Sequence, residues 1–330
     1  MRKARGILLL GLAGVLCAPA ADTIGIVDFY GYGGLDPANL RAVLPFHEGD
    51  PLPSDKLSAR ARDALQRFSG RPAVEVSSPV LGSEHWTVYI GLADPAAPPI
   101  LYNSHPTSDL ALPPMALKLF RQMDKDLFAA VKRGAVDEDD STGYTLTNDA
   151  ATRQDQSKLH EWARANTAVL YRVLEQSRHI DQRLRAAEAL GYAEHSSEQV
   201  AALVRAAFDD DAGVRNAAIR ALNVLCRLGA EVTRQIPAAR FIPLLYSLHW
   251  TDRNKSSWLL DMLTAARDPA LLEALHDRAV PPLREMLRWK DKGHAMPAAM
   301  ILGRIAGLPD AETGALLDAG DTAAIVRALR

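Results

Sequence analysis

The sequence predicts a small α+β module followed by an all-α array of helical repeats, so that the chain is mainly helical overall. Two observations predict this class. Residues 215–222 repeat the pattern of residues 183–190, with Arg, Ala, Ala and Leu at the same places 32 residues later. A fixed spacing of this size is typical of arrays of paired helices. Residues 21–95 instead mix strand-like and helix-like segments, which indicates a separate module.

Composition sets limits on the class of protein. The chain has 330 residues, which is enough for two domains. Its hydrophobic fraction of 48% and charged fraction of 24% are ordinary for a soluble globular protein. The net charge of −2 argues against a nucleic-acid partner, because such binders carry a basic excess on one face.

The first twenty residues have the pattern of a secretory signal peptide. Three positive residues, Arg2, Lys3 and Arg5, precede an apolar run at 7–16, and the small residues Ala18 and Ala20 allow cleavage near Ala20. Export, most simply to the periplasm, is therefore predicted. The apolar run is shorter than the roughly 20 residues that a membrane anchor needs. Lipidation at Cys17 is an alternative that the bulky Leu16 before it disfavours.

Cleavage would leave Cys226 as the single cysteine of the mature chain. No disulfide can then form within the chain, so its stability must come from packing. Cys226 lies in an apolar helical stretch, which predicts a buried thiol that behaves as a small hydrophobic side chain.

The module is expected to contain a strand, two helices and two further strands. Asp36 and Ser54 are suited to capping the two helices, and Gly70 to ending the second. Gly82-Ser83 indicates a hairpin between the last two strands. The predicted elements, in order, are residues 23–29, 36–44, 54–69, 73–77 and 86–90.

This order, with Leu44-Pro45-Phe46 leading into Glu48-Gly49-Asp50, resembles the polypeptide-transport-associated (POTRA) module of bacterial envelope proteins. The resemblance implies a periplasmic module that binds other chains, often by adding a strand at a sheet edge. It also implies a possible peripheral contact with a membrane complex of the envelope. The sequence departs from the family in its Gly-rich turn at 31–34 and in having no membrane span or barrel beside the module.

The turn at 31–34 has a second interpretation, as part of a dinucleotide-binding fingerprint. Gly31-x-Gly33 follows a strand and precedes a helix, as that fingerprint requires. However, Asp36 stands at the third glycine position, where its charge would oppose a pyrophosphate, and the following helix is short. A plain turn and no cofactor are therefore expected.

Residues 96–154 are expected to form a joint between module and array. A Pro-rich linker at 94–99 and a short strand at 100–103 precede a helix that opens at Pro113-Pro114. Four consecutive carboxylates follow, at Asp137, Glu138, Asp139 and Asp140. Their spacing does not match a calcium loop, because Gly143 is one place late and the closing Glu is missing. A solvated acidic loop is expected, with weak cation binding and a contact surface as alternatives.

The array is expected over 155–330. After a long opening helix at 155–176, the first repeat pairs a helix at 181–192 with one at 197–208, capped by Ser197. The second pairs 214–228 with a helix at 234–248, which Pro237 and Pro243 would bend. Degenerate copies follow Arg253 and begin near His294, and Asp321 would cap a last helix ending at Arg330.

The clearest copy, Asp-x-x-Val-Arg-x-x-Ala-x-x-Ala-Leu over Asp211–Leu222, resembles HEAT repeats. The resemblance implies a curved α-solenoid that presents a concave surface to a partner. An Asp before each first helix would cap it, and the Arg would bond to the Asp side of a neighbouring repeat. These residues are structural positions rather than catalytic ones: Arg183, Ala186, Leu190, Asp211, Val214, Arg215, Ala218, Leu222 and Arg253.

The sequence contains no recognisable catalytic motif. Ligation of a metal by a His pair needs a spacing of three or four residues on one helix face, and no two histidines are that close. Trp250, Trp258 and Trp289 are expected to be packing residues. The prediction is an exported protein–protein interaction scaffold or adaptor of the bacterial cell envelope, not an enzyme, without cofactor or metal and with an unknown protein partner. The alternative is a HEAT-like enzyme or metal-dependent protein whose site is not visible in the sequence.

Overall fold

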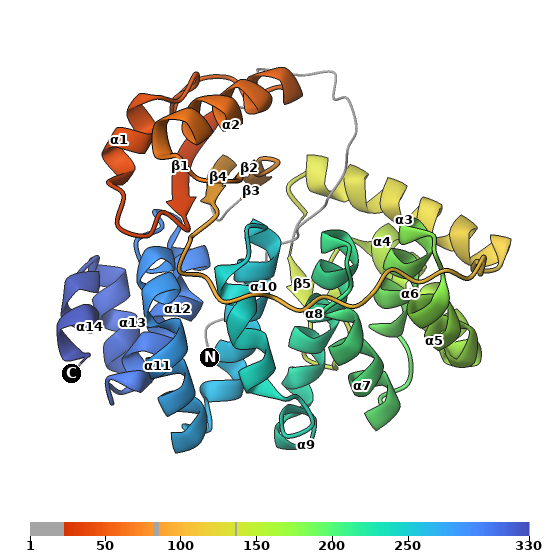
Figure 1. Cartoon of the computed structure of the whole chain (residues 1–330). Helices are drawn as coiled ribbons and strands as arrows, with labels where there is room; N and C mark the ends of the chain where they lie inside the picture. The colour runs from red at the N-terminus through yellow and green to blue at the C-terminus, as the bar shows by residue number, and fades with distance from the viewer. Residues whose placement is uncertain (1–22, 82–85, 136, 330) are drawn as a thin grey trace. The chain divides into compact units, whose positions relative to one another are not determined.

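The computed structural model describes residues 23–81, 86–135 and 137–329 (Figure 1). About 60% of these residues are helical and 9% lie in strands, which confirms a mainly helical chain with a small sheet. The predicted signal peptide, with Cys17, and the predicted hairpin turn at Gly82-Ser83 lie outside the described residues.

The chain divides into two compact units. One contains residues 101–237, and the other contains residues 23–100 together with 238–330. The N-terminal module therefore shares a unit with the last helices of the chain, and the division after residue 237 falls inside the segment predicted as one array. No helix among the described residues has the length and apolar character needed to cross a bilayer.

The module has the predicted order of elements, with one short strand added before the last. Asp36 and Ser54 accept hydrogen bonds from the first turns of the two helices, and Gly70 ends the second with a φ of 67°. Strand β4 is central: β1 runs parallel to it, while β2 and β3 are antiparallel to it. The elements are β1 Ile24–Tyr30, α1 Pro37–Ala42, α2 Asp55–Ser69, β2 Val74–Val76, β3 Val80–Leu81 and β4 Trp86–Leu92.

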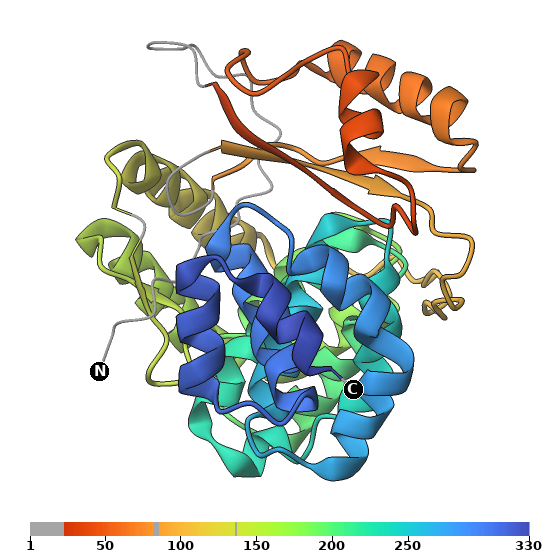
Figure 2. The ribbon, with the colours of Figure 1, turned by 90° about the vertical axis from the view of Figure 1, so that its left-hand side faces the viewer.

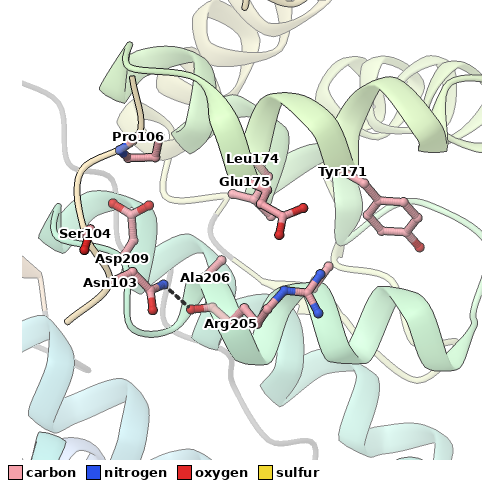
Figure 3. A pocket seen from close by; sticks show the side chains of 10 residues that line it. Asn103, Ser104, Pro106, Tyr171, Leu174, Glu175, Arg205, Ala206 and Asp209 are labelled. Atoms are coloured by element: carbon pink, nitrogen blue, oxygen red, sulfur yellow. Dashed lines mark hydrogen bonds between the residues drawn. The ribbon is translucent and has the colours of Figure 1, made fainter. Parts of the chain in front are cut away.

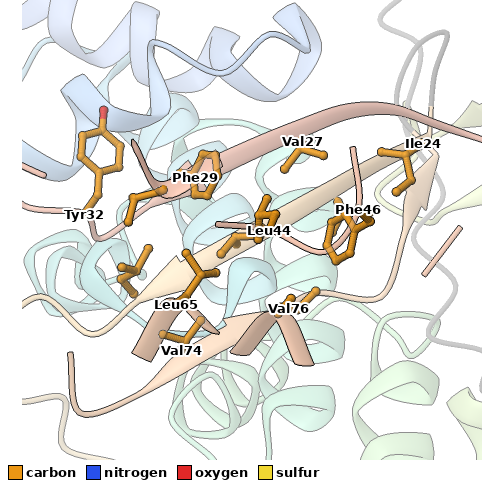
Figure 4. Close-up of a cluster of buried hydrophobic side chains, with 14 residues drawn as sticks. Ile24, Val27, Phe29, Tyr32, Leu44, Phe46, Leu65, Val74 and Val76 are labelled. Atoms are coloured by element: carbon orange, nitrogen blue, oxygen red, sulfur yellow. The ribbon is translucent and has the colours of Figure 1, made fainter. Parts of the chain in front are cut away.

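One face of this sheet is apolar and lies under α1 and α2 (Figures 2 and 4). Alternate residues of each strand reach this face because side chains alternate along a strand. Val88 and Ile90 of β4 are fully buried here, together with Leu40 of α1 and Leu65 of α2. This cluster is the hydrophobic core of the module.

The opposite face is aromatic and polar, and it packs against helices near the C-terminus within the same unit. The Tyr89 ring stacks on Trp250 at a centroid distance of 4.7 Å, and the Tyr89 hydroxyl lies 2.6 Å from Nδ1 of His294. The Tyr30 hydroxyl donates to the carbonyl of Leu248. Trp250 and Trp289 are 1% and 4% exposed, so both are packing residues as expected.

The Gly-rich turn at 31–34 binds a carboxylate of the chain itself. The backbone N–H groups of Gly31 and Gly33 donate to the two oxygens of Glu285 at 2.6 and 3.0 Å. Gly31 has a φ of 66°, and a Cβ there would lie 2.0 Å from the carbonyl oxygen of Leu92. The glycines therefore serve a close approach of backbone to backbone and to Glu285.

Two buried titratable groups on the polar face give opposite pH dependences. Burial raises the pKa of Asp28 to about 6, and burial lowers the pKa of His294 to about 4. Asp28 binds more protons in the folded state, so its contribution to stability falls as pH rises from about 4 to 6. His294 binds fewer, so its contribution rises over about pH 4 to 6.5. Each amounts to roughly 3 kcal/mol, and the two nearly cancel.

We therefore expect the two variants to depart from wild type in opposite directions. Asp28→Asn removes a contribution that falls with pH, so the stability of this variant relative to wild type should increase between about pH 4 and 6. His294→Gln leaves the Asp28 contribution and should show the reverse. Urea unfolding at several pH values, followed by Trp fluorescence, measures how the free energy of unfolding of each variant, relative to wild type, changes with pH. If this difference changed with pH in the same direction for both variants, the assigned pKa shifts of Asp28 and His294 would be contradicted.

Helices and a 3₁₀ segment complete this unit: η2 Ala238–Tyr246, α10 Trp250–Thr264, α11 Pro269–Met286, α12 Lys292–Ile305, α13 Asp310–Ala319 and α14 Thr322–Ala328. The helix predicted at 234–248 is wrong, because Pro237 and Pro243 remove backbone donors and leave a 3₁₀ segment. Asp321 caps α14 as predicted, and α14 ends at Ala328 rather than at Arg330.

The unit of residues 101–237 is built from helices and one short β-hairpin. The stretch 100–103 is not a strand, and the helix predicted at 155–176 is broken at Asn166. Ser196 rather than Ser197 caps the helix that follows it. The elements are α3 Pro114–Lys132, β5 Glu138–Asp139, β6 Leu146–Thr147, α4 Ala150–Ala165, α5 Thr167–Gln176, α6 Ile180–Leu190, α7 Ser197–Ala206, α8 Ala212–Leu225, η1 Cys226–Leu228 and α9 Ala230–Thr233.

Cys226 is free, 4% exposed, and burial raises the pKa of its thiol to about 12. We expect this thiol not to react with a thiol-specific reagent at pH 8 in the folded protein, because the thiolate is the reactive form. A Cys17→Ser chain isolates Cys226 for the measurement. Labelling should begin only when urea unfolds the protein, and full labelling within minutes under native conditions would contradict the burial.

Candidate functional site

The repeat arginines occupy one structural position in three helices. Each is the fourth residue of its helix, is at most 1% exposed, and donates to the carbonyl six residues before it. The three bonds are Arg183 to Ser177 at 2.9 Å, Arg215 to Asp209 at 2.9 Å and Arg253 to Ser247 at 2.7 Å. The same place in α12 is occupied by Ala295, beside His294, near which the fourth copy was predicted to begin.

Arg183 also joins successive loops of its unit. Its Nε and Nη2 donate to the two oxygens of Asp209 at 2.8 Å each, and Nη2 donates to Asp210 at 2.6 Å. Burial raises the pKa of Asp209, and the bonds from Arg183 oppose this rise. The structure thus contains the predicted contact between the Arg of one repeat and the Asp side of the next.

The capping pattern holds at two predicted copies, before α8 and before α12, where Asp291 accepts from the backbone N–H of His294. Asp211 accepts from the backbone N–H of Gly213 and Val214. The residues immediately before α6 and α10 are instead His179 and His249, whose side chains make no capping bond. The Asp residues of these two copies, Asp181 and Asp252, lie inside the first turn of the helix. The remaining predicted positions are fully buried: Ala186, Leu190, Val214, Ala218 and Leu222.

Arg253 is the least satisfied of the three arginines. Burial lowers the pKa of its guanidinium, and Glu285 opposes this shift from 3.6 Å away. Its guanidinium lies over the ring of Tyr30 at 4.7 Å. Its Nη1 and Nη2 are buried and have no hydrogen-bond acceptor among the described residues. The charge therefore depends on Glu285 and on the aromatic face.

An extended segment, residues 101–113, crosses the loops that contain this Arg network; we call it the strap. The backbone of the strap forms hydrogen bonds with the backbone of these loops. The N–H of Asn103 donates to the carbonyl of Phe208 at 2.7 Å, and that of Ser108 to Gln176 at 3.0 Å. The N–H of Arg178 donates back to Ser108 at 2.8 Å. The segment that follows the predicted Pro-rich linker is thus fixed to the helical unit.

Charged and aromatic side chains fix the strap further. His105 lies 2.7 Å from Asp210, and His179 lies 2.5 Å from Asp109. The hydrogen bond from His179 holds the pKa of Asp109 below its usual value. The guanidinium of Arg215 lies 4.2 Å from the centre of the Tyr102 ring. Arg183 and Arg215 therefore support both the loops and the strap.

A groove of about 250 Å³ lies between the strap, α5 and α7; we call it the α5–α7 groove (Figure 3). Leu174, Ala202 and Ala206 give it an apolar floor, because the two alanines leave space on α7. Polar and charged groups stand around this floor. The remaining lining residues are Asn103, Ser104, Pro106, Tyr171, Glu175, Arg205 and Asp209.

Three polar side chains of the groove are not satisfied by the described chain. Glu175 and Arg205 are exposed and have no ion-pair partner among the residues that the structure describes. The hydroxyl of Tyr171 is buried and has no hydrogen-bond partner there. Figure 3 shows all three side chains in the space between α5 and α7. The groove can therefore offer a cation, an anion and a hydroxyl to a ligand.

The acidic loop is largely engaged within its own unit. Glu138 pairs with Arg220 at 2.6 Å and Asp140 pairs with Arg227 at 3.0 Å. Asp139 accepts from Ser141, which holds the pKa of Asp139 below its usual value. The carbonyl of Asp137 accepts from Asn148 in the β5–β6 hairpin. The loop is thus less solvated than expected, and no cluster of metal-ligating side chains occurs within the described ranges.

The groove was not predicted from the sequence. Tyr171, Glu175 and Arg205 lie on helices that were predicted, but no repeat pattern marks them. The strap was visible only as a Pro-rich break before an uncharacterised stretch. The four-residue spacing of Tyr171 and Glu175 places them on one helix face and was the available signal.

Comparisons with known proteins add little. No known protein family and no curated protein matches the chain. Two engineered proteins solved by the Northeast Structural Genomics Consortium are similar over 52% of this chain, each with a TM-score of 0.37. The first is 23% identical and is covered over 79% of its length, and the second is 20% identical and is covered over 48%. Neither is named for an activity.

Proposed function

We propose that the mature chain is an exported scaffold or adaptor of the bacterial cell envelope that binds a protein partner in the α5–α7 groove. The observation that carries this proposal is a groove with an apolar floor whose walls include two charges without an ion-pair partner in the described chain, Glu175 and Arg205, and the unpaired hydroxyl of Tyr171. A partner with complementary charges would pair with these side chains when it covers the groove, whereas a charge left to solvent contributes nothing to the fold.

Helix packing supports a HEAT-like α-solenoid as the framework. In the unit of residues 101–237, α6 packs on α8 and α5 packs on α7, so first helices follow first helices and second follow second. In the other unit α10 packs on α12, and η2 packs on α11. The equivalent Arg bonds recur at the same helical position in both units. Proteins of this architecture present extended surfaces to partners.

The N-terminal module is proposed to be POTRA-like, on its order of elements. The outer edge of β1 is already used: the N–H of Val27 donates to Glu48, and the carbonyl of Phe29 accepts from Nε1 of Trp289. The β2 and β3 side is the other edge of the sheet. We assign any strand addition by a partner to that edge. The signal-peptide pattern of residues 1–20 supports export.

Affinity purification of the mature protein from its own periplasm tests the proposal. Wild type should capture a protein that Arg205→Glu captures at less than a tenth of the amount, because the substitution reverses a charge in the groove. Arg172→Glu is the matched control, since Arg172 is exposed on α5 and does not line the groove. Equal capture by all three proteins, or no capture by wild type, would overturn the proposal.

A further inference from the structure

We infer that the segment held in the α5–α7 groove is an extended peptide that presents a carboxylate to Tyr171 and Arg205 and a cationic side chain to Glu175. This inference rests on the proposed function and names the chemistry of the partner. It follows from the three unsatisfied side chains of the groove and from the way in which the chain binds its own strap.

Tyr171 gives the first indication. Its hydroxyl oxygen is buried yet has no hydrogen-bond partner among the described residues, although Tyr171 lines the groove. A buried hydroxyl without a partner is costly, and native structures satisfy almost all such groups with protein, water or ligand. A phenol donates one O–H, so a carboxylate oxygen is a suitable acceptor.

Arg205 gives the second indication. Its backbone carbonyl accepts from the Asn103 side chain, which fixes this part of α7 against the strap. Its guanidinium extends into the groove without an ion-pair partner in the described chain (Figure 3). A planar guanidinium binds a carboxylate through two parallel hydrogen bonds, and these are stronger than bonds between neutral groups.

Glu175 indicates that the peptide carries a positive charge next to its carboxylate. A peptide carboxylate alone would be repelled by the Glu175 charge, which forms no ion pair with any described residue. A Lys or Arg next to the acidic residue of the peptide removes this repulsion. The apolar floor of Leu174, Ala202 and Ala206 leaves room for an aliphatic side chain between the two charges.

The strap shows that these helix ends accept extended backbone. The chain itself places residues 101–113 across the loops after α5 and α7, with backbone hydrogen bonds at Asn103 and Ser108. The pair Ser108 and Ser177 forms a parallel bridge. An extended partner segment beside the strap would therefore meet a surface already shaped by peptide backbone.

Fluorescence anisotropy with a library of labelled dodecapeptides, each with an Asp or Glu next to a Lys or Arg, tests the inference on the mature full chain. Bound peptides should lose at least tenfold in affinity when the acidic residue is changed to its amide. Tyr171→Phe and Arg205→Gln should each cause a roughly tenfold loss. Arg172→Gln, on the exposed face of α5, should change affinity less than twofold.

Glu175→Gln provides a test of sign. It should weaken peptides that carry the basic residue and strengthen matched peptides in which that residue is Gln, because the repulsion is removed. Equal binding of acidic and amide peptides, unchanged binding in both Tyr171→Phe and Arg205→Gln, or no binding from the library would overturn the inference. If protein capture is still lost in Arg205→Glu, the proposed function stands while this peptide chemistry does not.

Discussion

Replacing Arg183 by Ala is expected to destabilise the unit of residues 101–237 by about 3–5 kcal/mol. The side chain is 0% exposed and pairs with Asp209 through two bonds of 2.8 Å. Its removal leaves the buried carboxylate of Asp209 without its counter-ion and also frees the carbonyl of Ser177. Trp162 is the single Trp of residues 101–237, so its fluorescence during urea unfolding reports this unit.

Arg172→Ala is the control for this prediction. Because Arg172 is exposed, its replacement should lower the free energy of unfolding by less than about 0.5 kcal/mol. A double variant, Arg183→Met with Asp209→Leu, should recover much of the loss, since it removes both charges together. If Arg183→Ala lowered the free energy of unfolding no more than the control does, Arg183 would not stabilise this unit.

Glu285→Ala is expected to destabilise the unit of residues 23–100 and 238–330, again by about 3–5 kcal/mol. The carboxylate accepts from the backbone of Gly31 and Gly33 and lies 3.6 Å from the buried Arg253. Without it two N–H groups lose their acceptor and the Arg253 charge loses its counter-ion. The module would then be held to α11 by fewer polar contacts.

Urea unfolding followed by fluorescence measures this effect, because the other four Trp residues all lie in that unit. Glu273→Ala, an exposed position on the same helix, is the matched control and should cost less than about 0.5 kcal/mol. Glu285→Gln should lie between the two, since it retains an acceptor oxygen and loses the charge. Equal stability of the Ala variants at 273 and 285 would contradict the role of Glu285.

Local signals in the sequence were sufficient to place many elements. Asp36, Ser54 and Asp321 cap the helices for which they were predicted, because capping depends on a few neighbouring residues. The cap predicted at Ser197 lies one residue earlier, at Ser196, because two adjacent serines offer the same chemistry. The 3₁₀ segment η2 was not predicted, because there the two prolines decide between helix types.

Long-range packing was not accessible in the same way. Tyr89 and His294 are 205 residues apart in sequence, and their contact depends on the shapes of a sheet and two helices. The grouping of the module with residues 238–330 follows from such contacts, and no local pattern encodes them. The α5–α7 groove is likewise set by where the strap crosses two helix ends.

The affinity of the captured partner for the α5–α7 groove tests the central claim most directly. Titration calorimetry of that partner with wild type, Arg205→Glu and Arg172→Glu compares the same charge change inside and outside the groove. A binding groove predicts at least a tenfold higher Kd for Arg205→Glu and a change below twofold for Arg172→Glu. Equal Kd values for all three proteins would show that the partner does not bind in the groove.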